Sequence, residues 1–326
     1  NAYIETAEGW IGIAERLKKT PLKSTQANSA PIPISKPSAG DSAHTNESEF
    51  LVTDKPDVSF DDIDGMEQAK ATIREMVIYP IQNPENAKSL KVSAGGGVLL
   101  YGPPGNGKTM FGKAIAHEID APFFYASGAQ IRSKWHGESE QRLSALINSA
   151  RQHPIAVLFL DEVDGLLPKR TEDGSDVDNR LVTQFLTEVG GFKDSDNTLL
   201  ILGATNNPWN IDEAVFRTGR FDEKIFIGLP DEAARKGMLK REFQDVPLTP
   251  SFDLLHWVKV LEGYTGSDIV GVAKKSRQVA FRRSIEENTP AVVSMDDFEK
   301  SLKTIPSSVT PELVQRYISF NEARFS

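Results

Sequence analysis

Short apolar segments alternate with amphipathic stretches through the middle of the chain. The apolar segments have the length of β-strands and are Gly97–Tyr101, Phe123–Ala126, Ile155–Leu160, Leu199–Ala204 and Ile225–Leu229. Helical periodicity separates the first four of them, in Lys108–Ile119, Glu138–Arg151 and Asn179–Val189. This alternation predicts an α/β domain in which a parallel five-stranded sheet is flanked by helices.

The pattern becomes wholly helical after Pro230. This change predicts a large α/β subdomain over residues 56–230 and a small all-helical subdomain over 231–306. A last helix is predicted within 307–326, with Thr310 as its N-cap residue.

The first residues have an amphipathic pattern of their own. Apolar side chains recur at helical spacing in residues 1–20, at Tyr3, Ala7, Trp10, Ala14 and Leu17. We interpret this stripe as the end of a docking bundle, with a membrane-surface helix as the less favoured alternative because of its acidic residues. A Pro- and Ser-rich linker is expected over 21–55, and a helix over Met66–Tyr79 that ends before Pro80.

Composition narrows the class of protein. Hydrophobic residues make up 39% of the 326 residues and charged residues 25%, as in ordinary globular proteins. The net charge of −9 argues against a protein that binds mainly to the nucleic-acid backbone. The absence of Cys excludes disulfides, Cys-ligated zinc and thiol nucleophiles, and it fits a cytoplasmic location. The apolar runs are too short for a membrane helix.

The most specific motif is GPPGNGKT at Gly102–Thr109, which lies between a predicted strand and a predicted helix. In this context the motif indicates a P-loop that binds nucleotide phosphates with backbone N–H groups and a helix N-terminus. We expect Lys108 to neutralise the phosphates and the Thr109 hydroxyl to ligate Mg²⁺. The expected nucleotide-binding residues here are Gly102, Pro103, Pro104, Gly105, Asn106, Gly107, Lys108, Thr109 and Met110.

Candidate catalytic groups follow the later strands. Asp161 and Glu162 end the third predicted strand, where Asp161 would ligate Mg²⁺ and Glu162 would activate water. Asn206 follows the fourth strand, from where its amide would reach the γ-phosphate. Arg217 and Arg220 precede the fifth strand and suit the role of arginine fingers.

Trp135 lies between Lys134 and His136 in a charged, Gly-containing stretch. One interpretation is a half-buried indole at the start of a helix. The other is an aromatic residue on an exposed loop that grips a substrate.

Taken together, these motifs resemble the AAA ATPases over about Phe60 to Ser326. The similar segments are FDDIDG, GPPGNGKT, KWHGESE, LFLDEVD, GATNNP, RTGRFD and GYTGSD. The final segment VTPELVQRYISFNEARF resembles the closing helix of the meiotic clade, which includes katanin, spastin, fidgetin and the ATPase that disassembles ESCRT-III filaments. The stripe in residues 1–20 is similar to the last helix of the MIT docking domain, which implies a docking partner for the N-terminal region.

The resemblance implies a homo-hexameric ring, promoted by ATP, with ATP and Mg²⁺ bound between neighbours. It implies that Asp62, Ile63, Gly266 and Ser267 lie near the adenine, and that Asn206 is the sensor asparagine. Arg217 and Arg220 would reach into the neighbour's site. Lys134, Trp135 and His136 would form the pore loop that grips an extended polypeptide.

The chain departs from the clade's pattern at three places. Thr218 and Gly219 separate the two finger arginines, which are adjacent in the clade. Gly190 stands where the family often has an acidic residue in the segment that couples subunits. The stretch 231–306 is too short for the β-insertion of the ESCRT-III-disassembling ATPase. The sequence therefore assigns the chain neither to that ATPase nor to the microtubule-severing enzymes.

We therefore expect an ATP-hydrolysing ring motor that remodels, threads or disassembles protein assemblies. Two alternatives stay open at this point. One is a nucleic-acid motor or loader, against which the net charge argues. The other is a scaffold that uses ATP only to hold a ring, against which the intact Lys108, Asp161 and Glu162 argue.

Overall fold

The computed structural model describes residues 51–322 except 54, 93–94, 133–137, 171–175, 191–196 and 218. The helix predicted for 1–20, nearly all of the predicted linker and the predicted pore-loop residues Lys134, Trp135 and His136 lie outside the described residues.

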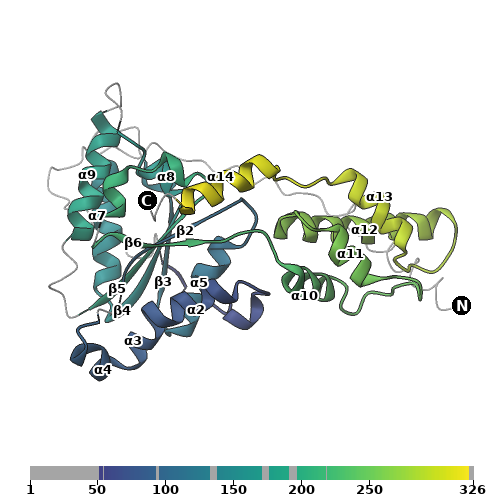
Figure 1. Ribbon diagram of the computed structural model, residues 1–326, viewed down its shortest axis with the longest axis horizontal. Helices are drawn as coiled ribbons and strands as arrows, with labels where there is room; N and C mark the ends of the chain where they lie inside the picture. Colours follow the sequence, from purple (N-terminus) through teal and green to yellow (C-terminus); the bar gives the residue numbers. More distant parts are fainter. Residues whose placement is uncertain are drawn as a thin grey trace, which may run out of the picture. The chain divides into compact units, whose positions relative to one another are not determined.

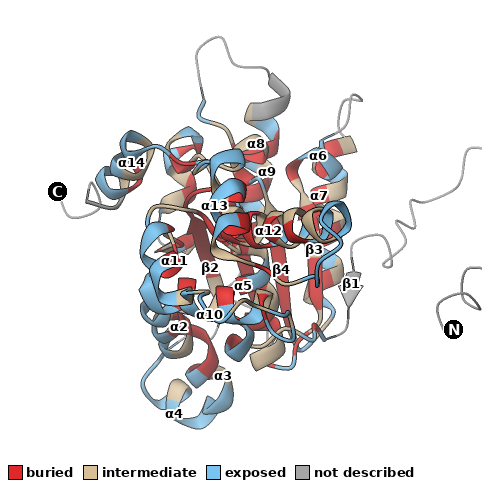
Figure 2. Ribbon diagram, turned by 90° about the vertical axis from the view of Figure 1, so that its right-hand side faces the viewer, coloured by how far each residue is buried: buried red, intermediate tan, exposed pale blue. Residues whose placement is uncertain are grey.

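A six-stranded sheet, with the order β1-β3-β4-β5-β2-β6, forms the centre of the large subdomain (Figure 1). The five predicted strands are confirmed as β2 (Gly96–Tyr101), β3 (Phe123–Ser127), β4 (Ile155–Asp161), β5 (Thr198–Thr205) and β6 (Phe221–Phe226), and they pair in parallel. β2 and β4 are almost continuously apolar because helices cover both of their faces. Figure 2 shows these strands as the most buried part of the sheet.

The sheet has an additional antiparallel edge strand, β1 (Leu51–Thr53), which pairs with β3. The predicted linker over 21–55 therefore overlaps an element of the sheet. β1 is only three residues long, so it has no alternating pattern that a sequence could reveal.

β6 begins earlier than the predicted Ile225–Leu229. It lies at the other edge of the sheet, where Phe221 and Ile225 are buried but Asp222 is exposed and Lys224 half-buried, so that charged residues fit within the strand. The apolar run used for the prediction covers only the end of the strand and the exit from it.

Alternate residues of the strands contribute to two separate cores, one on each face of the sheet. Leu99 and Tyr101 belong to the core on one face, beneath the helices Glu138–Arg151 (α7) and Pro311–Glu322 (α14). Val98 and Leu100 belong to the core on the other face, beneath the helix Lys108–Glu118 (α5). The helices of the large subdomain are α2 (Glu67–Ile73), α3 (Tyr79–Gln82), α4 (Pro84–Ser89), α5 (Lys108–Glu118), α6 (Gly128–Ile131), α7 (Glu138–Arg151), α8 (Val163–Leu166) and α9 (Asp176–Gly190). Short 3-10 turns follow at Pro208–Asn210 and Glu213–Phe216.

The helix predicted to stop before Pro80 instead continues through it, so this prediction is wrong. A π-helical segment, Arg74–Ile78, connects α2 directly to α3, and Pro80 lies in the first turn of α3. A π-helical turn is wider than an α-helical one, which accommodates a ring that has no N–H to donate.

The chain after Pro230 forms the predicted helical subdomain from α10 (Glu232–Glu242), α11 (Leu254–Val260), α12 (Gly266–Glu286) and α13 (Met295–Thr304). These helices surround their own apolar core, which includes Trp257 and Phe298. Arg283 of α12 donates to the fully buried carboxylate of Asp297 in α13. The last helix, α14 (Pro311–Glu322), returns to the large subdomain, where Tyr317 joins its core.

Candidate nucleotide-binding and catalytic site

The P-loop connects β2 to α5 at the carboxyl edge of the sheet. Gly102 leaves β2 with φ 149, and a Cβ there would lie 2.1 Å from the backbone oxygen of Ile227. Gly107 has φ 82 and precedes the first turn of α5. Both positions require glycine, because an L side chain would be strained or would collide with backbone. The helix N-terminus consequently faces the turn of the loop, as an anion site needs.

Lys108, the first residue of α5, is buried at 8% exposure. Its ammonium donates to the backbone oxygens of Gly102 and Pro103 at 2.9 Å and to Oδ1 of Asn206 at 2.7 Å. Burial lowers the pKa of Lys108 to about 8, and the charges of Asp161 and Asp164 oppose this shift. The ammonium is thus a buried cation with neutral acceptors, suited to gain an anionic partner.

Asp161 ends β4 beside the start of α5. Its Oδ2 accepts from the hydroxyls of Thr109 and Tyr125, both at 3.3 Å. The Asp161 charge, after burial, contributes to a raised pKa of Tyr125, so this phenol remains a donor. The two Mg²⁺ ligands predicted from the sequence therefore lie in contact with each other.

Glu162 follows directly and is exposed to solvent. Its backbone has φ 52, in the left-handed region, which is uncommon for a residue with a side chain and often marks a functional site. Asp164 has a structural role instead, because its carboxylate accepts from Thr205 at 2.7 Å and from Asn207 at 3.2 Å. It thereby holds the two neighbours of Asn206 in place.

Asn206 also has a partner that the sequence did not indicate. The buried hydroxyl of Tyr317 in α14 donates to the backbone oxygen of Asn206. Burial, with a contribution from Asp164, raises the pKa of Tyr317 to about 12, so the hydroxyl keeps its proton. In the sequence, Leu313, Tyr317 and Phe320 recur at helical spacing, which indicates burial of Tyr317 but not this bond.

Arg217 and Arg220 lie at the other end of the strands. Arg220 directly precedes β6, whose first residue Phe221 pairs with Gly97 at the amino end of β2. Arg220 donates to the backbone oxygen of Ala214 at 2.5 Å, and Arg217 is exposed. The structure does not bring these two arginines to the P-loop of their own chain.

The residues expected near the adenine divide into two groups. Gly266 and Ser267, at the start of α12, donate their backbone N–H groups to Asn106 and Gly105 of the P-loop, both at 3.0 Å. Asp62 instead accepts from Ser59, which lowers its pKa.

Two further residues expected to bind the nucleotide, Ile63 and Met110, differ in exposure. Ile63 is buried in the core beneath α5, and its backbone oxygen accepts from Lys70 at 2.6 Å. Met110, in the first turn of α5, is 36% exposed.

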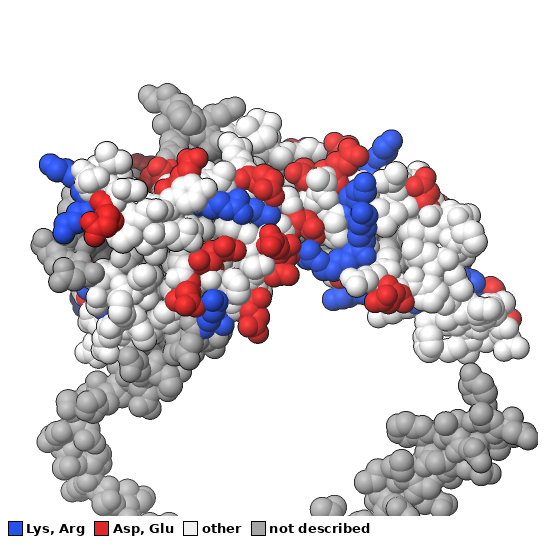
Figure 3. Space-filling view, turned by 90° about the horizontal axis from the view of Figure 1, so that it is seen from below, with Lys and Arg blue, Asp and Glu red and all other residues white. Residues whose placement is uncertain are grey.

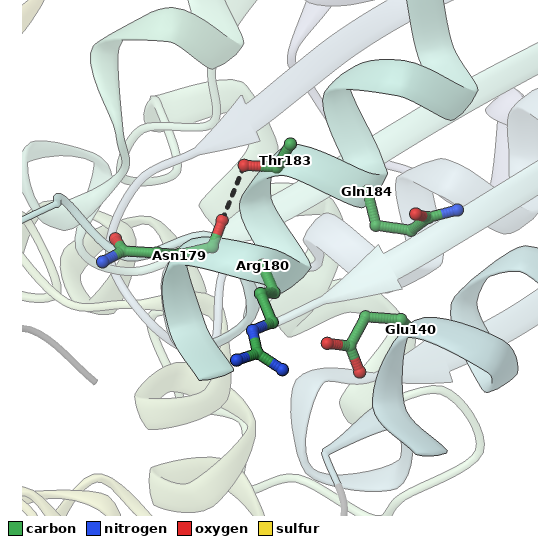
Figure 4. Close-up of a pocket in the computed structure, with 5 residues that line it drawn as sticks. All are labelled: Glu140, Asn179, Arg180, Thr183 and Gln184. Carbon is green, nitrogen blue, oxygen red and sulfur yellow. Dashed lines mark hydrogen bonds between the residues drawn. The ribbon is translucent and has the colours of Figure 1, made fainter. Parts of the chain in front are cut away.

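A separate polar cavity of about 530 Å³ lies between the amino-terminal parts of α7 and α9. Its lining consists of Glu140, Asn179, Arg180, Thr183 and Gln184 (Figure 4). The Arg180 side chain extends toward Glu140, and the Thr183 hydroxyl donates to the backbone oxygen of Asn179 at 2.8 Å. None of these residues belongs to the predicted phosphate site.

The residues present fit ATP and Mg²⁺. Asn106 in the P-loop has a buried amide nitrogen without a hydrogen-bond partner, and Lys108 is buried among neutral oxygens. Thr109 and Asp161 would hold Mg²⁺, which supplies charge neutralisation on the phosphates. Within the described part of the chain, no group of three or more His, Asp or Glu could hold a metal by itself. Thr109 and Asp161 together offer two oxygen ligands, which suits an ion whose other ligands come from phosphate and water.

No helix in the described residues has both the length and the apolar character of a membrane span.

Comparison with known proteins agrees with this site. The family model for the ATPase family associated with various cellular activities (AAA) matches residues 98–229. Protein SAV of Sulfolobus acidocaldarius is 39% identical over 272 residues, which cover 79% of this chain and 35% of that protein. The cell division cycle protein 48 homolog of Archaeoglobus fulgidus is 38% identical over 273 residues, which cover 80% of this chain and 37% of that protein.

Spastin of Homo sapiens is 40% identical over 275 residues, which cover 81% of this chain and 44% of that protein. The chain thus spans less than half the length of these relatives. The residues that the family model matches include the P-loop, the carboxylates at the end of β4 and Asn206. The chain therefore belongs to the AAA ATPases, and its relatives include both spastin and the cell division cycle protein 48 homolog.

Proposed function

We propose that the protein works as a homo-hexameric ring that binds ATP between neighbouring copies and uses its hydrolysis to thread or disassemble protein substrates. The relatives that support this proposal include spastin and the cell division cycle protein 48 homolog. The substrate is a polypeptide or a protein polymer, and residues 1–20 are the proposed docking segment for a partner. The cytoplasmic location predicted from the absence of Cys is part of the same proposal.

The position of the arginines carries the proposal. Gly97, beside Arg220, and Gly102, at the start of the P-loop, lie at opposite ends of β2. The rise of a strand separates these two glycines by about 17 Å. An arginine side chain cannot span that distance to its own P-loop. Arg217, exposed at this far edge, is therefore available to a nucleotide held by another copy.

Within each site we assign one task to each residue. Lys108 neutralises charge on the β- and γ-phosphates, and Thr109 and Asp161 hold Mg²⁺. Glu162 accepts the proton of the attacking water, for which its exposed side chain is suited. Asn206, hydrogen-bonded to Lys108, orients the reacting end of the nucleotide.

Trp135, with Lys134 and His136, is the proposed grip on the substrate. A large aromatic side chain provides contact area for many sequences at low entropic cost.

Mixed rings test the assignment of the arginines. Arg220→Ala and Lys108→Ala proteins should each lack ATPase activity, and mixing them should restore part of it because one interface then contains every group. The wild-type rate per subunit should also rise with protein concentration. A matched control mixes two Lys108→Ala preparations, which should remain inactive. Co-assembly without any rescue would exclude action between subunits.

Threading is tested separately through Trp135. Trp135→Ala should keep basal ATPase activity but lose its stimulation by substrate, whereas Trp135→Phe should keep much of it. If the indole were part of a core, the Ala variant would lose about 3–5 kcal/mol of stability, and a lower melting temperature would accompany loss of both activities.

The nucleic-acid alternative has little support. The net charge is −9, and on the face shown in Figure 3 basic and acidic side chains are interspersed. An electrostatic footprint for nucleic acid would require a clustered basic surface. Stimulation of the ATPase by polynucleotide but not by protein would favour that alternative, and ring formation without turnover would favour the scaffold.

A further inference from the structure

The P-loop caps the amino terminus of α12. The first N–H groups of a helix have no partners within the helix itself. In α12, the capping box of Thr265 and Asp268 satisfies two of them. Gly266 N donates to Oδ1 of Asn106 and Ser267 N to the backbone oxygen of Gly105, both at 3.0 Å.

This contact is tight as well as hydrogen-bonded. A Cβ on Gly105 would lie 2.0 Å from the hydroxyl oxygen of Ser267, and one on Gly266 would lie 3.2 Å from the backbone oxygen of Gly105. The P-loop and the first turn of α12 therefore fit together only in a narrow range of positions. Movement of the small subdomain at this point must break both hydrogen bonds.

Asn106 has a second polar group that this contact does not use. The N–H of Gly266 can only donate, so the amide atom that faces it must be Oδ1. The Nδ2 group is left on the other side, buried and without a hydrogen-bond partner. Asn106 is 4% exposed, so solvent does not replace the missing partner. A buried donor left unpaired is costly, which favours an acceptor from a ligand.

We propose that Asn106 couples nucleotide binding to the docking of the small subdomain: Oδ1 holds the first turn of α12 while Nδ2 donates to an oxygen of the bound nucleotide. This inference rests on the proposed nucleotide site at the P-loop. Nucleotide satisfies the buried donor and fixes the plane of the amide, which keeps Oδ1 against Gly266. The coupling is reciprocal, so displacement of α12 weakens nucleotide binding by the same factor.

Two substitutions distinguish the role of Oδ1 of Asn106 as an acceptor from the role of Nδ2 as a donor. Asn106→Asp keeps an acceptor for Gly266 but replaces the donor with an anionic oxygen. Asn106→Ala removes both groups. Ser308→Ala is the matched control, because Ser308 donates to Asp268 at the same end of α12 at 2.8 Å and does not touch the P-loop.

Two readouts are independent of turnover: the Kd for ADP by calorimetry, and hydrogen exchange of the Gly266 and Ser267 amides with and without ADP. In the wild type, ADP should slow this exchange about tenfold.

The variants should differ in both readouts. In Asn106→Asp, exchange without ADP should stay near the wild-type rate, and ADP should bind at least about tenfold more weakly. Saturating ADP should no longer slow the exchange in this variant. Asn106→Ala should exchange faster without ADP and also bind it more weakly. Ser308→Ala should exchange faster without ADP but keep its Kd within about twofold and its response to ADP.

Two results would overturn the inference. One is an unchanged Kd in both Asn106 variants, and the other is wild-type exchange that does not respond to ADP. If Asn106→Asp melts below the assay temperature, the Asn106→Ala and wild-type measurements still decide between these outcomes. Lys108→Ala tests the underlying site: normal ADP binding by that variant would refute the nucleotide site itself, whereas loss of binding there with normal binding in Asn106→Ala refutes only the coupling.

Discussion

Lys108 combines a buried position with acceptors that are all neutral. Its ammonium contacts two P-loop carbonyls and the Asn206 amide, and burial lowers its pKa to about 8. A bound polyphosphate would favour the charged form and raise this pKa again. Nucleotide binding should therefore be linked to proton uptake by a single residue.

At pH 9 a lysine with a pKa of about 8 is about nine-tenths deprotonated, and at pH 7 about one-tenth. When ADP binds, Lys108 should consequently take up close to one proton per site at pH 9 and only about one-tenth of a proton at pH 7. Calorimetry in buffers of different ionisation enthalpy measures this number. Lys108→Arg is the control, since its guanidinium stays charged and the pH-dependent uptake should disappear. Equal uptake by both proteins at pH 9 would assign the proton to another group.

At the scale of elements, α14 connects the end of the chain to the catalytic edge of the sheet. Tyr317 packs against Trp209 and Phe226, with ring centroids 5.1 and 5.9 Å apart, and its hydroxyl holds the backbone of Asn206. Arg316 stacks over Trp209 at 3.7 Å and adds to the same contact. We therefore treat Tyr317 as a positioning residue that acts through Asn206.

Tyr317→Phe should lower kcat about tenfold and change KM little, because it removes the support of Asn206 without altering the P-loop. Loss of the hydroxyl also removes the donor to the part-buried carbonyl of Asn206, at a cost of about 1 kcal/mol in stability. Thr310→Ala is the comparison: it removes the N-cap bond to Leu313 at 3.3 Å but leaves Tyr317 intact. An equal loss of kcat in both variants would show that α14 matters only through its stability.

At the scale of the molecule, the two subdomains have separate cores. The core around Trp257 and Phe298 shares no residue with the two cores that flank the sheet. The Phe298 ring stacks on Trp257 with centroids 4.5 Å apart and is fully buried. The small subdomain can therefore lose its packing while the sheet keeps its own.

Phe298→Ala should destabilise the helical subdomain by about 3–5 kcal/mol and leave the sheet folded. Hydrogen exchange should then become faster in α10 to α13 but not in β2, β4 and β5. Phe159→Ala, in the core beneath α5, is the reciprocal variant and should affect the sheet. Simultaneous loss of protection in both subdomains of the Phe298 variant would show that they unfold as one unit.

Much of the fold followed from local patterns. The helix over Glu138–Arg151 has the predicted bounds, and four of the five parallel strands lie within a residue or so of their predicted positions. Errors occurred where a pattern was short or ambiguous: the three-residue β1, the continuation through Pro80 and the early start of β6. In each case a tertiary neighbour decided the outcome, either a strand partner or helix packing.

The sequence also predicted the chemistry of the site. The Gly-rich loop between strand and helix, and the carboxylates after a buried strand, predict phosphate and Mg²⁺ binding because few other arrangements need those residue types together. The sequence by itself therefore predicted the proposed reaction class, and it identified residues that the structure brings into contact: Lys108 with Asn206, and Thr109 with Asp161.

Only the tertiary structure decided which distant residues meet. Tyr317 bonds to Asn206 across 111 positions, and Asn106 bonds to Gly266 across 160. The parallel pairing of β6 with β2 places Arg220 at the amino end of these strands, whereas the P-loop follows the carboxyl end of β2. Local periodicity reports which face of an element is buried, but it does not report which partner buries it. Those partners depend on strand order and on the return path of α14, which are properties of the whole folded chain.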